Sequence, residues 1–387
     1  MNHEILASNI RFYRKAAGLT QEQLGSQLFL SAQTISKWEN ALTVPDLENV
    51  CMLASVLHIP FDKLFDGVLP PAADVAYLGI DGGGTKTEFV LFSPDGEVYH
   101  RIVAGGTNPN IYGIEAACAT LSQGITAMLQ LAKHIDGVFA GIAGSSAADH
   151  AANMQKALQA QFPNLPIRIE SDIMNVFYST EEQPSTAVIL GTGAVVYVRT
   201  TNGLKRLGGY GYLLDGAGSG YDIGRDILCA CLEAEDGLRA ETPLLQAARV
   251  KWGGGRLWDV LDTVYNGGKE YIASFAPLAF TFYTEGDSLA ADILRKNLQR
   301  IAELLDTAAE LYGADGPAVL AGGLTARADI ISEIFRTTMK HPVPLIFPTR
   351  SPIYGACVYC HHLFAKEDKP KTFGDTFAAT YNDAKGE

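Results

Sequence analysis

The sequence predicts two modules of different fold class, a small all-α module of five helices and a larger α/β module. Two observations predict this. Residues 4–66 form five short amphipathic patterns with helix-capping signals, whereas from Val75 onward apolar strands alternate with helices. The strand pattern also restarts at Thr186, which predicts a duplicated fold. We therefore expect these segments: the helical domain at 1–67, a Pro-containing linker at 68–75, a first lobe at 76–185, a second lobe at 186–365 whose helix 351–364 packs on the first, and a flexible tail at 366–387.

The composition excludes several classes of protein. The 387 residues contain no apolar run long enough to span a bilayer, and Met1–Lys15 has a helical pattern without the apolar core of a signal peptide, so we expect a cytoplasmic protein with no membrane partner. The six cysteines form no disulfide framework, and Cys357-Val-Tyr-Cys360-His-His362 has no second ligand pair to complete a zinc site. The net charge of −13 means that DNA binding must depend on local charge.

The helical module contains a helix pair joined by a tight turn. Thr20 is placed to cap its first helix, with Gln23 in the capping-box position. Ser31 is placed to cap the second, residues 32–40, whose inward positions are Ile35 and Trp38. In a helix-turn-helix the second helix enters the major groove. A bundle used only for dimerisation or protein contact is the alternative.

Gly18-Leu-Thr-Gln-Glu-Gln-Leu24 and Ser31-Ala-Gln-Thr-Ile-Ser-Lys-Trp-Glu-Asn40 closely resemble the Cro and repressor family, also called the XRE family. The resemblance covers residues 4–66 and implies a homodimer on a double-stranded DNA operator. It implies that Ala32, Gln33 and Lys37 face base edges, and that Gln21, Thr34 and Ser36 lie near the DNA backbone. Gln and Lys suit adenine and guanine edges respectively. Position 41 is Ala where this family often has Gly.

Glycine-rich turns follow strands of the larger module. Strand 75–80 ends in Asp81-Gly-Gly-Gly-Thr-Lys-Thr87, strand 186–190 ends in Gly191-Thr-Gly193, and strand 318–321 precedes Gly322-Gly323. A helical insert spans residues 218–311. Glycines let backbone N–H groups approach phosphate oxygens, and a carboxylate such as Asp81 suits Mg²⁺ beside phosphates. One such turn alone would suggest a hairpin, but matched turns in two similar halves favour a phosphate site.

These motifs resemble the actin-like ATPase superfamily, and within it the N-acetylglucosamine kinases and the BadF/BadG-type ATPases. The resemblance covers residues 76–365 and implies a ribonuclease H-like duplicated fold, with two lobes around a cleft for ATP and Mg²⁺. The implied ATP-binding residues are Asp81, Gly82, Gly83, Gly84, Thr85, Lys86, Gly191, Thr192, Gly193, Gly322 and Gly323, with Asp81 serving Mg²⁺ through the phosphates.

By the same resemblance Asp172 is the catalytic base, which accepts the proton of a sugar hydroxyl that attacks the γ-phosphate. A helix N-cap is its alternative role, and the two are compatible. The implied sugar-binding residues are Thr107, Asn108, Gly144, Ser145, Asp172, Gly209 and Asp215. Where these kinases commonly have Gly-Asp-Glu-Gly-Ser, this chain has Asp215-Gly-Ala-Gly-Ser219. The sugar therefore stays open among N-acetylglucosamine, an N-acetylmuramic acid derivative and a glucose-type hexose.

Three functions follow from these patterns. The first is an ATP-dependent amino-sugar kinase fused to a DNA-binding domain, which would act as a sugar-responsive transcriptional regulator. The second is a catalytically silent sensor of sugar and ATP that represses transcription. The third, an ATPase that activates a protein partner, is disfavoured because the sequence has no cysteine cluster for an iron–sulfur centre.

Overall fold

A computed structural model describes residues 3–17, 19–57, 59, 61–65, 75–132, 134–147, 149–215 and 217–384. The chain forms two compact units: unit 1 comprises Met1–Ser179 and Ser351–Glu387, and unit 2 comprises Thr180–Arg350. The boundary therefore falls at Thr180, ahead of the predicted boundary at residue 186. The predicted linker at 68–75 lies outside the described residues except for Val75.

The N-terminal helices of unit 1 are α1 (His3–Ala16), α2 (Gln21–Gln27), α3 (Ala32–Glu39), α4 (Leu47–Val56) and the 3₁₀ helix η1 (Phe61–Leu64). Both predicted caps are present. Thr20 and Gln23 form a capping box at α2, and the Ser31 hydroxyl accepts the Thr34 N–H at α3. Leu24, Ile35 and Trp38 are buried in one core, so the prediction of an all-α helix-turn-helix domain is confirmed.

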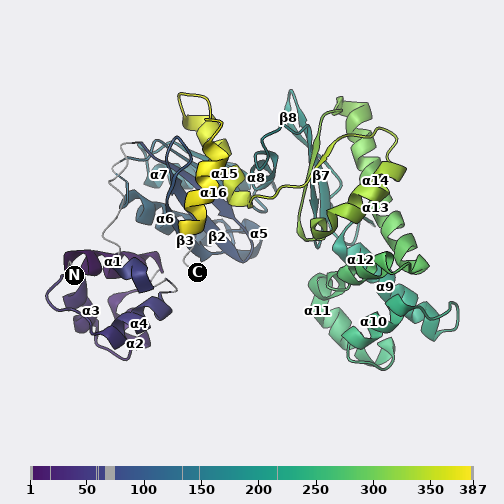
Figure 1. The fold of residues 1–387 in the computed structure, drawn as a ribbon, viewed down its shortest axis with the longest axis horizontal. Coiled ribbons are helices and arrows are strands. Elements are labelled where there is room, and N and C mark those ends of the chain that lie inside the picture. The colour runs from purple at the N-terminus through teal and green to yellow at the C-terminus, as the bar shows by residue number, and fades with distance from the viewer. Residues whose placement is uncertain are drawn as a thin grey trace. The chain divides into compact units, whose positions relative to one another are not determined.

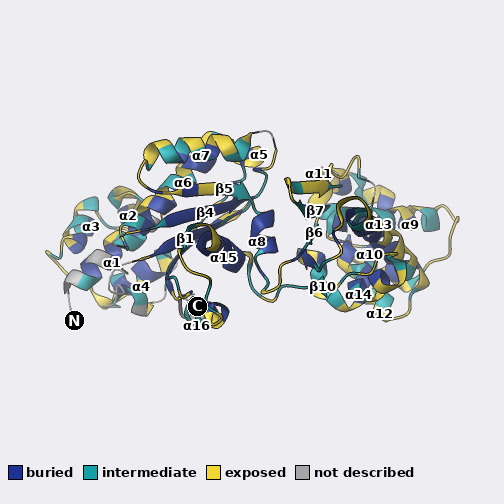
Figure 2. Cartoon of the chain, turned by 90° about the horizontal axis from the view of Figure 1, so that it is seen from above, coloured by how far each residue is buried: buried dark blue, intermediate teal, exposed yellow. Residues whose placement is uncertain are grey.

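The rest of unit 1 is a five-stranded sheet covered by helices on both faces. Its strands are β1 (Tyr77–Gly82), β2 (Lys86–Phe92), β3 (Val98–Gly105), β4 (Gly137–Ile142) and β5 (Ile167–Ser171), in the order β3-β2-β1-β4-β5. Helices α6 (Ile114–Leu129) and α7 (His150–Gln161) lie over one face and α15 (Pro352–Phe364) over the other (Figure 2). Two short helices, α5 (Pro109–Tyr112) and α8 (Ile173–Phe177), follow β3 and β5.

Unit 2 repeats this sheet. Its strands are β6 (Thr186–Leu190), β7 (Ala194–Thr200), β8 (Gly203–Leu207), β9 (Ala318–Ala321) and β10 (Leu345–Ile346), in the order β8-β7-β6-β9-β10. Each sheet thus has an antiparallel three-stranded meander followed by two strands parallel to the first. The predicted duplication is confirmed, and β8 is an additional strand that the sequence analysis did not assign.

Helices account for the rest of unit 2. Between β8 and β9 lie α9 (Gly220–Glu235), α10 (Pro243–Lys251), η2 (Leu257–Val260), α11 (Leu261–Ala273), α12 (Ala276–Thr284) and α13 (Ser288–Tyr312). After β9 come η3 (Gly323–Arg327) and α14 (Ala328–Thr338). The helices pack with the sheet in one large core. No helix among the described residues of the whole chain is long and apolar enough to cross a membrane.

The expected flexible tail is wrong for residues 373–384, because this segment forms helix α16 (Phe373–Ala384), drawn in yellow beside α15 (Figure 1). Phe373, Phe377 and Tyr381 are buried. The Tyr381 hydroxyl donates to Glu88 Oε1 at 2.6 Å, and α16 packs along β3. These aromatic residues occur at intervals of four and form one apolar stripe, which is typical of an amphipathic helix. The sequence analysis missed this pattern because most other residues of the tail are polar.

Candidate functional site

The first glycine-rich turn connects β1, the central strand of the unit 1 sheet, to its neighbour β2. Asp81 pairs with Glu88 of β2 on one side and with Gly141 of β4 on the other. The turn is held by backbone bonds from Gly83 N to Lys86 O (2.9 Å) and from the Thr107 N–H to Gly83 O (3.0 Å). Thr85 and Lys86 are exposed. A fixed backbone with exposed side chains suits a turn that receives phosphate.

Asp172 lies at the start of α8, directly after β5. Its side chain makes no capping hydrogen bond to α8, so the alternative role as an N-cap is not seen, and its Oδ1 accepts the Ser171 hydroxyl at 3.1 Å. Burial raises the pKa of Asp172. The pKa of Asp81 is raised to about 6, mainly by burial, with the charges of Asp172 and Glu88 adding to the rise. The two carboxylates therefore affect each other electrostatically within unit 1.

Asn175 is a residue of this site that the sequence analysis missed. It is fully buried on α8, and its Nδ2 donates to Asp81 Oδ1 at 2.6 Å. This bond lowers the pKa of Asp81 and so opposes the effect of burial. The sequence carried only a weak signal, an asparagine one helical turn after the proposed base.

The predicted sugar-binding residues of unit 1 divide into two groups. Asn108 lies at the start of α5, where its side chain accepts the Asn110 N–H, and Asn110 Nδ2 donates to Gly144 O at 3.2 Å. These bonds bring the Asn108 and Gly144 loops together. Thr107 is instead fully buried, with its hydroxyl 2.9 Å from that of Thr87, so its side chain supports the sheet and does not face a ligand. Ser145 is buried, and its hydroxyl has no hydrogen-bond partner among the described residues.

The second and third glycine turns meet inside unit 2. The Gly220 N–H at the start of α9 donates to Gly191 O (2.8 Å), and the Tyr221 N–H donates to Thr192 O (3.2 Å). Gly322 has φ +111°, and a Cβ there would collide with the backbone of Leu190. Only glycine fits at this close approach. The structure thus places Gly191, Thr192 and Gly193 beside Gly322 and Gly323, and of these Thr192, Gly193, Gly322 and Gly323 are exposed.

The loop that departs from the kinase pattern follows β8. Gly209 has φ +75°, and a Cβ on it would contact Val195 and Arg206. The Asp215 carboxylate accepts the Tyr210 N–H within this loop, so one of its oxygens is used locally. Gly216 lies outside the described residues. Tyr210, Leu213 and Leu214 are exposed by 66–81%.

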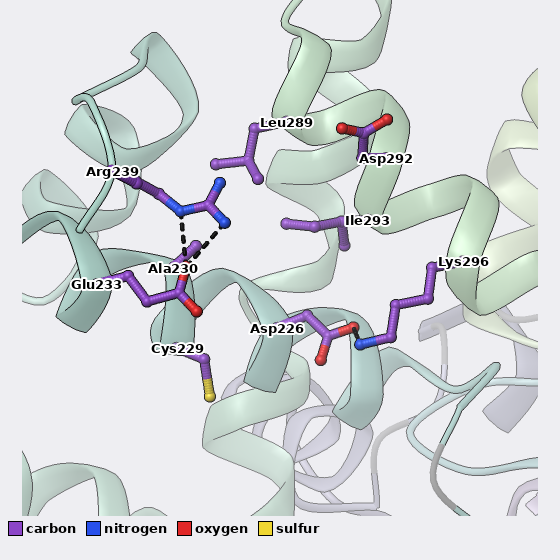
Figure 3. Close-up of a pocket in the computed structure, with 9 residues that line it drawn as sticks. All are labelled: Asp226, Cys229, Ala230, Glu233, Arg239, Leu289, Asp292, Ile293 and Lys296. Atoms are coloured by element: carbon purple, nitrogen blue, oxygen red, sulfur yellow. Dashed lines mark hydrogen bonds and ion pairs between the residues drawn. The ribbon is translucent and has the colours of Figure 1, made fainter.

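A separate cavity of about 260 Å³ lies between α9 and α13 of unit 2 (Figure 3). Its two cationic residues are already paired: Lys296 Nζ lies 2.9 Å from Asp226 Oδ2, and Arg239 bonds to Glu233 at 2.8 Å. None of the predicted site residues lines it. Because both of its cations face carboxylates, the cavity has no free positive group for phosphate.

The predicted DNA-facing residues are only partly free to contact DNA. Gln33 and Lys37 are exposed on α3, and Ala32 is half-buried. Gln21 Nε2 donates to Glu39 Oε2 at 2.8 Å, so this side chain serves the domain's own structure. The remaining two predicted residues also bond within the domain, Thr34 to the Ser31 hydroxyl and Ser36 to Asn40. Gln33 and Lys37 are therefore the side chains free to reach base edges.

Comparison with known proteins agrees with these features. The chain is 26% identical over 307 residues to an N-acetyl-D-glucosamine kinase of Dictyostelium discoideum, covering 73% of this chain and 96% of that protein. It is 24% identical over 296 residues to an N-acetylmuramic acid/N-acetylglucosamine kinase of Clostridium acetobutylicum, with the same coverage. The crystal structure of a putative N-acetylglucosamine kinase from Porphyromonas gingivalis is similar in fold, with a TM-score of 0.58, 21% identity, and coverage of 74% of this chain and 99% of that one.

Family models match both parts of the chain. A helix-turn-helix model matches residues 10–64, which include α2, α3 and α4. A model of the BadF/BadG/BcrA/BcrD ATPase family matches residues 78–359, from β1 to α15, and so spans all three glycine turns and Asp172. The chain therefore belongs to the BadF/BadG/BcrA/BcrD ATPase family and carries a helix-turn-helix domain at its N-terminal end.

Proposed function

We propose that this protein is an ATP-dependent amino-sugar kinase whose activity or ligand binding regulates transcription through its helix-turn-helix domain. The catalytic part rests on the position of two carboxylates: Asp81 lies near the end of β1 and Asp172 directly after β5, and both strands pair with β4 beside the first glycine turn. The relatives support the substrate class, since both curated kinases are named for N-acetylglucosamine and one also for N-acetylmuramic acid.

Asp172 acts in this proposal as general base. Its carboxylate accepts the proton of a sugar hydroxyl as that oxygen attacks the γ-phosphorus of ATP, and the bond from phosphorus to the β,γ-bridging oxygen breaks to release ADP. Burial raises the proton affinity of Asp172, which favours this transfer at neutral pH. Asn108 and the Gly144 loop would orient the sugar hydroxyl.

The residues present fit Mg²⁺ bound mainly through phosphate. The described residues contain no cluster of three or more His, Cys, Asp or Glu side chains, so no all-protein metal cage is available. Mg²⁺ in phosphotransferases commonly uses one or two carboxylates together with phosphate oxygens and water. Asp81, partly exposed at the end of β1, supplies such a carboxylate. When bound, the ion would neutralise charge on the β- and γ-phosphates.

The DNA-binding part of the proposal depends on α3. Its exposed Gln33 and Lys37 can reach base edges, and its N-terminal end can accept a phosphate. Because one helix-turn-helix module reads a short half-site, we propose that a homodimer binds a double-stranded operator. Sugar and ATP would be its effectors.

The test is ADP release by the purified protein with N-acetylglucosamine, N-acetylmuramate, N-acetylmannosamine and glucose. We expect turnover with at least one amino sugar. Asp172→Asn should lower kcat by at least about a thousandfold, because it removes the proton acceptor, while ATP affinity stays within about twofold. Asp149→Asn, which changes an exposed carboxylate of unit 1, is the matched control. Turnover that survives Asp172→Asn would remove Asp172 from the mechanism.

One observation favours the silent sensor as second candidate. The Asp215 carboxylate, the one acidic group left in the altered loop, bonds to the Tyr210 N–H of that same loop. A pocket with fewer carboxylates for sugar hydroxyls would bind sugar without aligning it for transfer. A change in DNA affinity on adding sugar, with no ADP release from ATP in the presence of any sugar tested, would establish this candidate.

A further inference from the structure

The Asn175 side chain is buried beside Asp81 with only one end of its amide satisfied. Its Nδ2 donates to Asp81 Oδ1 at 2.6 Å, while its own Oδ1 has no partner among the described residues. An asparagine selected only for stability would normally have both amide ends bonded, since an unpaired buried carbonyl is unfavourable. The one bond that it makes is directed at the carboxylate of the phosphate turn.

The surrounding chain makes room for this amide. A Cβ on Gly141, which pairs with Asp81 across β1 and β4, would collide with the Asn175 side chain. A Cβ on Gly355 of α15 would collide with the Asn175 backbone oxygen. Two glycines from different elements thus hold Asn175 closely on both sides, and its amide has little freedom to turn away from Asp81.

The two oxygens of Asp81 differ as a result. Oδ1 accepts the bond from Asn175, and Oδ2 accepts no hydrogen bond from any described residue. The carboxylate is therefore held by one oxygen, which leaves the other for a ligand. Helix α8, which begins after Asp172, also connects Asn175 to the proposed base, since the Asn175 N–H donates to Asp172 O at 3.0 Å.

We propose that Asn175 is a positioning residue that orients Asp81 for Mg²⁺–ATP. The inference rests on the proposed function only in that Asp81 serves Mg²⁺ bound through phosphate. It assigns to Asn175 no contact with substrate. The amide fixes the direction of the carboxylate, and without it Asp81 rotates among several orientations, so ordering the carboxylate on binding costs affinity.

The experiment measures ATP binding by calorimetry over a series of Mg²⁺ concentrations, without sugar. The proteins are the full-length wild type, Asn175→Ala, Asp81→Asn and the double variant, with Asn175→Ser as a smaller change if Asn175→Ala does not fold. Ser179→Ala is the matched control, because Ser179 is buried near α8 and, among the described residues, its hydroxyl bonds only to Val176 O (2.7 Å).

We expect Asn175→Ala to weaken the apparent Mg²⁺ affinity by about tenfold, the usual effect of losing a residue that orients a metal ligand. Ser179→Ala should leave it unchanged. In the Asp81→Asn background, Asn175→Ala should have no further effect, because its partner is already gone. A purely structural role would instead give a change that is independent of Asp81.

Two results would overturn the inference: Mg²⁺ affinity unchanged in a folded Asn175 variant, or equal effects of the Asn175 change with and without Asp81. Failure of the proposed function gives a different result. A protein that phosphorylates no sugar but shows Mg²⁺-dependent ATP binding with the expected coupling would retain Asn175 in this role and lose only the kinase assignment.

Discussion

Phe29 and Ala41 hold left-handed backbone conformations at the ends of α2 and α3, with φ of +57° and +55°. In each case the next N–H bonds back to the helix, from Leu30 to Gly25 O and from Leu42 to Lys37 O, the pattern that usually has glycine at the turn. A side chain in this conformation costs about 1 kcal/mol relative to glycine. Both turns are therefore formed with less suitable residues than the geometry prefers.

We predict that Phe29→Gly and Ala41→Gly each stabilise the helix-turn-helix domain by about 1 kcal/mol. Hydrogen exchange of the α2 and α3 amides in the full-length protein measures this directly. Ser26→Gly, at an exposed helical position of α2, should have the opposite effect, a loss of about 0.5–1 kcal/mol. If hydrogen exchange also became slower in Ser26→Gly, the left-handed backbone conformation could not be the reason why the glycine variants are more stable.

The raised pKa of Asp81 makes the stability of the folded protein depend on pH. The folded pKa of about 6 lies above the ordinary value of 3.8, so the folded state binds a proton more tightly than the unfolded state. The stabilisation from that proton is present below pH 4 and is lost as the pH rises through about 6. Above this range the charge of Asp81, which is largely removed from water, opposes folding.

We therefore predict that Asp81→Asn raises the melting temperature at pH 8 and changes it little at pH 4. The rise in the pKa of Asp81 from 3.8 to about 6 corresponds to a change of at most about 3 kcal/mol in the free energy of unfolding. Differential scanning calorimetry at the two pH values measures the difference, with Asp149→Asn as the exposed control. Equal shifts at both pH values would contradict the raised pKa.

At the scale of secondary-structure elements, α16 is the least expected part of the fold. Its buried aromatic residues cover β3 and the neighbouring part of the sheet, and Phe373 packs edge-on against Phe92 at a centroid distance of 6.0 Å. The Tyr381 hydroxyl donates to Glu88 Oε1, and the same oxygen lies 2.5 Å from Arg101 Nε in an ion pair. The helix is thus part of the core of unit 1.

Phe377→Ala should lower the free energy of unfolding of unit 1 by about 3–5 kcal/mol, since it leaves a cavity where an aromatic ring was buried. Ala378→Ser, at an exposed position of the same helix, should change it by less than about 0.5 kcal/mol. Urea unfolding of the two variants compares them. Similar midpoints for both would mean that α16 is not packed as described.

What the sequence predicted well are elements with strong periodicity or distinctive turns, including the five N-terminal helical segments and the strands β1, β6 and β9 that precede the glycine turns. Strand β8 was missed because its polar residues Lys205 and Arg206 are exposed and leave no apolar alternation. The hydrogen-bond partners of individual side chains could not be predicted from the sequence either. The bonds of Thr107 to Thr87, Gln21 to Glu39 and Asn175 to Asp81 join residues at least 18 positions apart, and only tertiary packing fixes them.

At the scale of the whole molecule, an acidic chain with a net charge of −13 is predicted to bind DNA through few cationic residues. Lys37→Ala should weaken operator binding and reduce the slope of log affinity against log salt concentration by about 1, because one phosphate or base contact is lost. Fluorescence anisotropy with the protein's own upstream DNA measures both quantities. Lys371→Ala, exposed near the other end of the chain, should change neither.

The division of the chain between its units has a consequence for biosynthesis. Unit 2 is one continuous segment, whereas unit 1 needs α15 and α16, which are made after the whole of unit 2. At bacterial or eukaryotic translation rates, the ribosome takes on the order of 10–40 s to travel from residue 179 to residue 384, where α16 ends. Throughout that interval the faces of β1 and β4 that α15 later covers stay open on the nascent chain. Helix α15 also packs on α8, which follows Asp172, so the packing around the Asp81 and Asp172 site is completed only once residues 352–364 have been made.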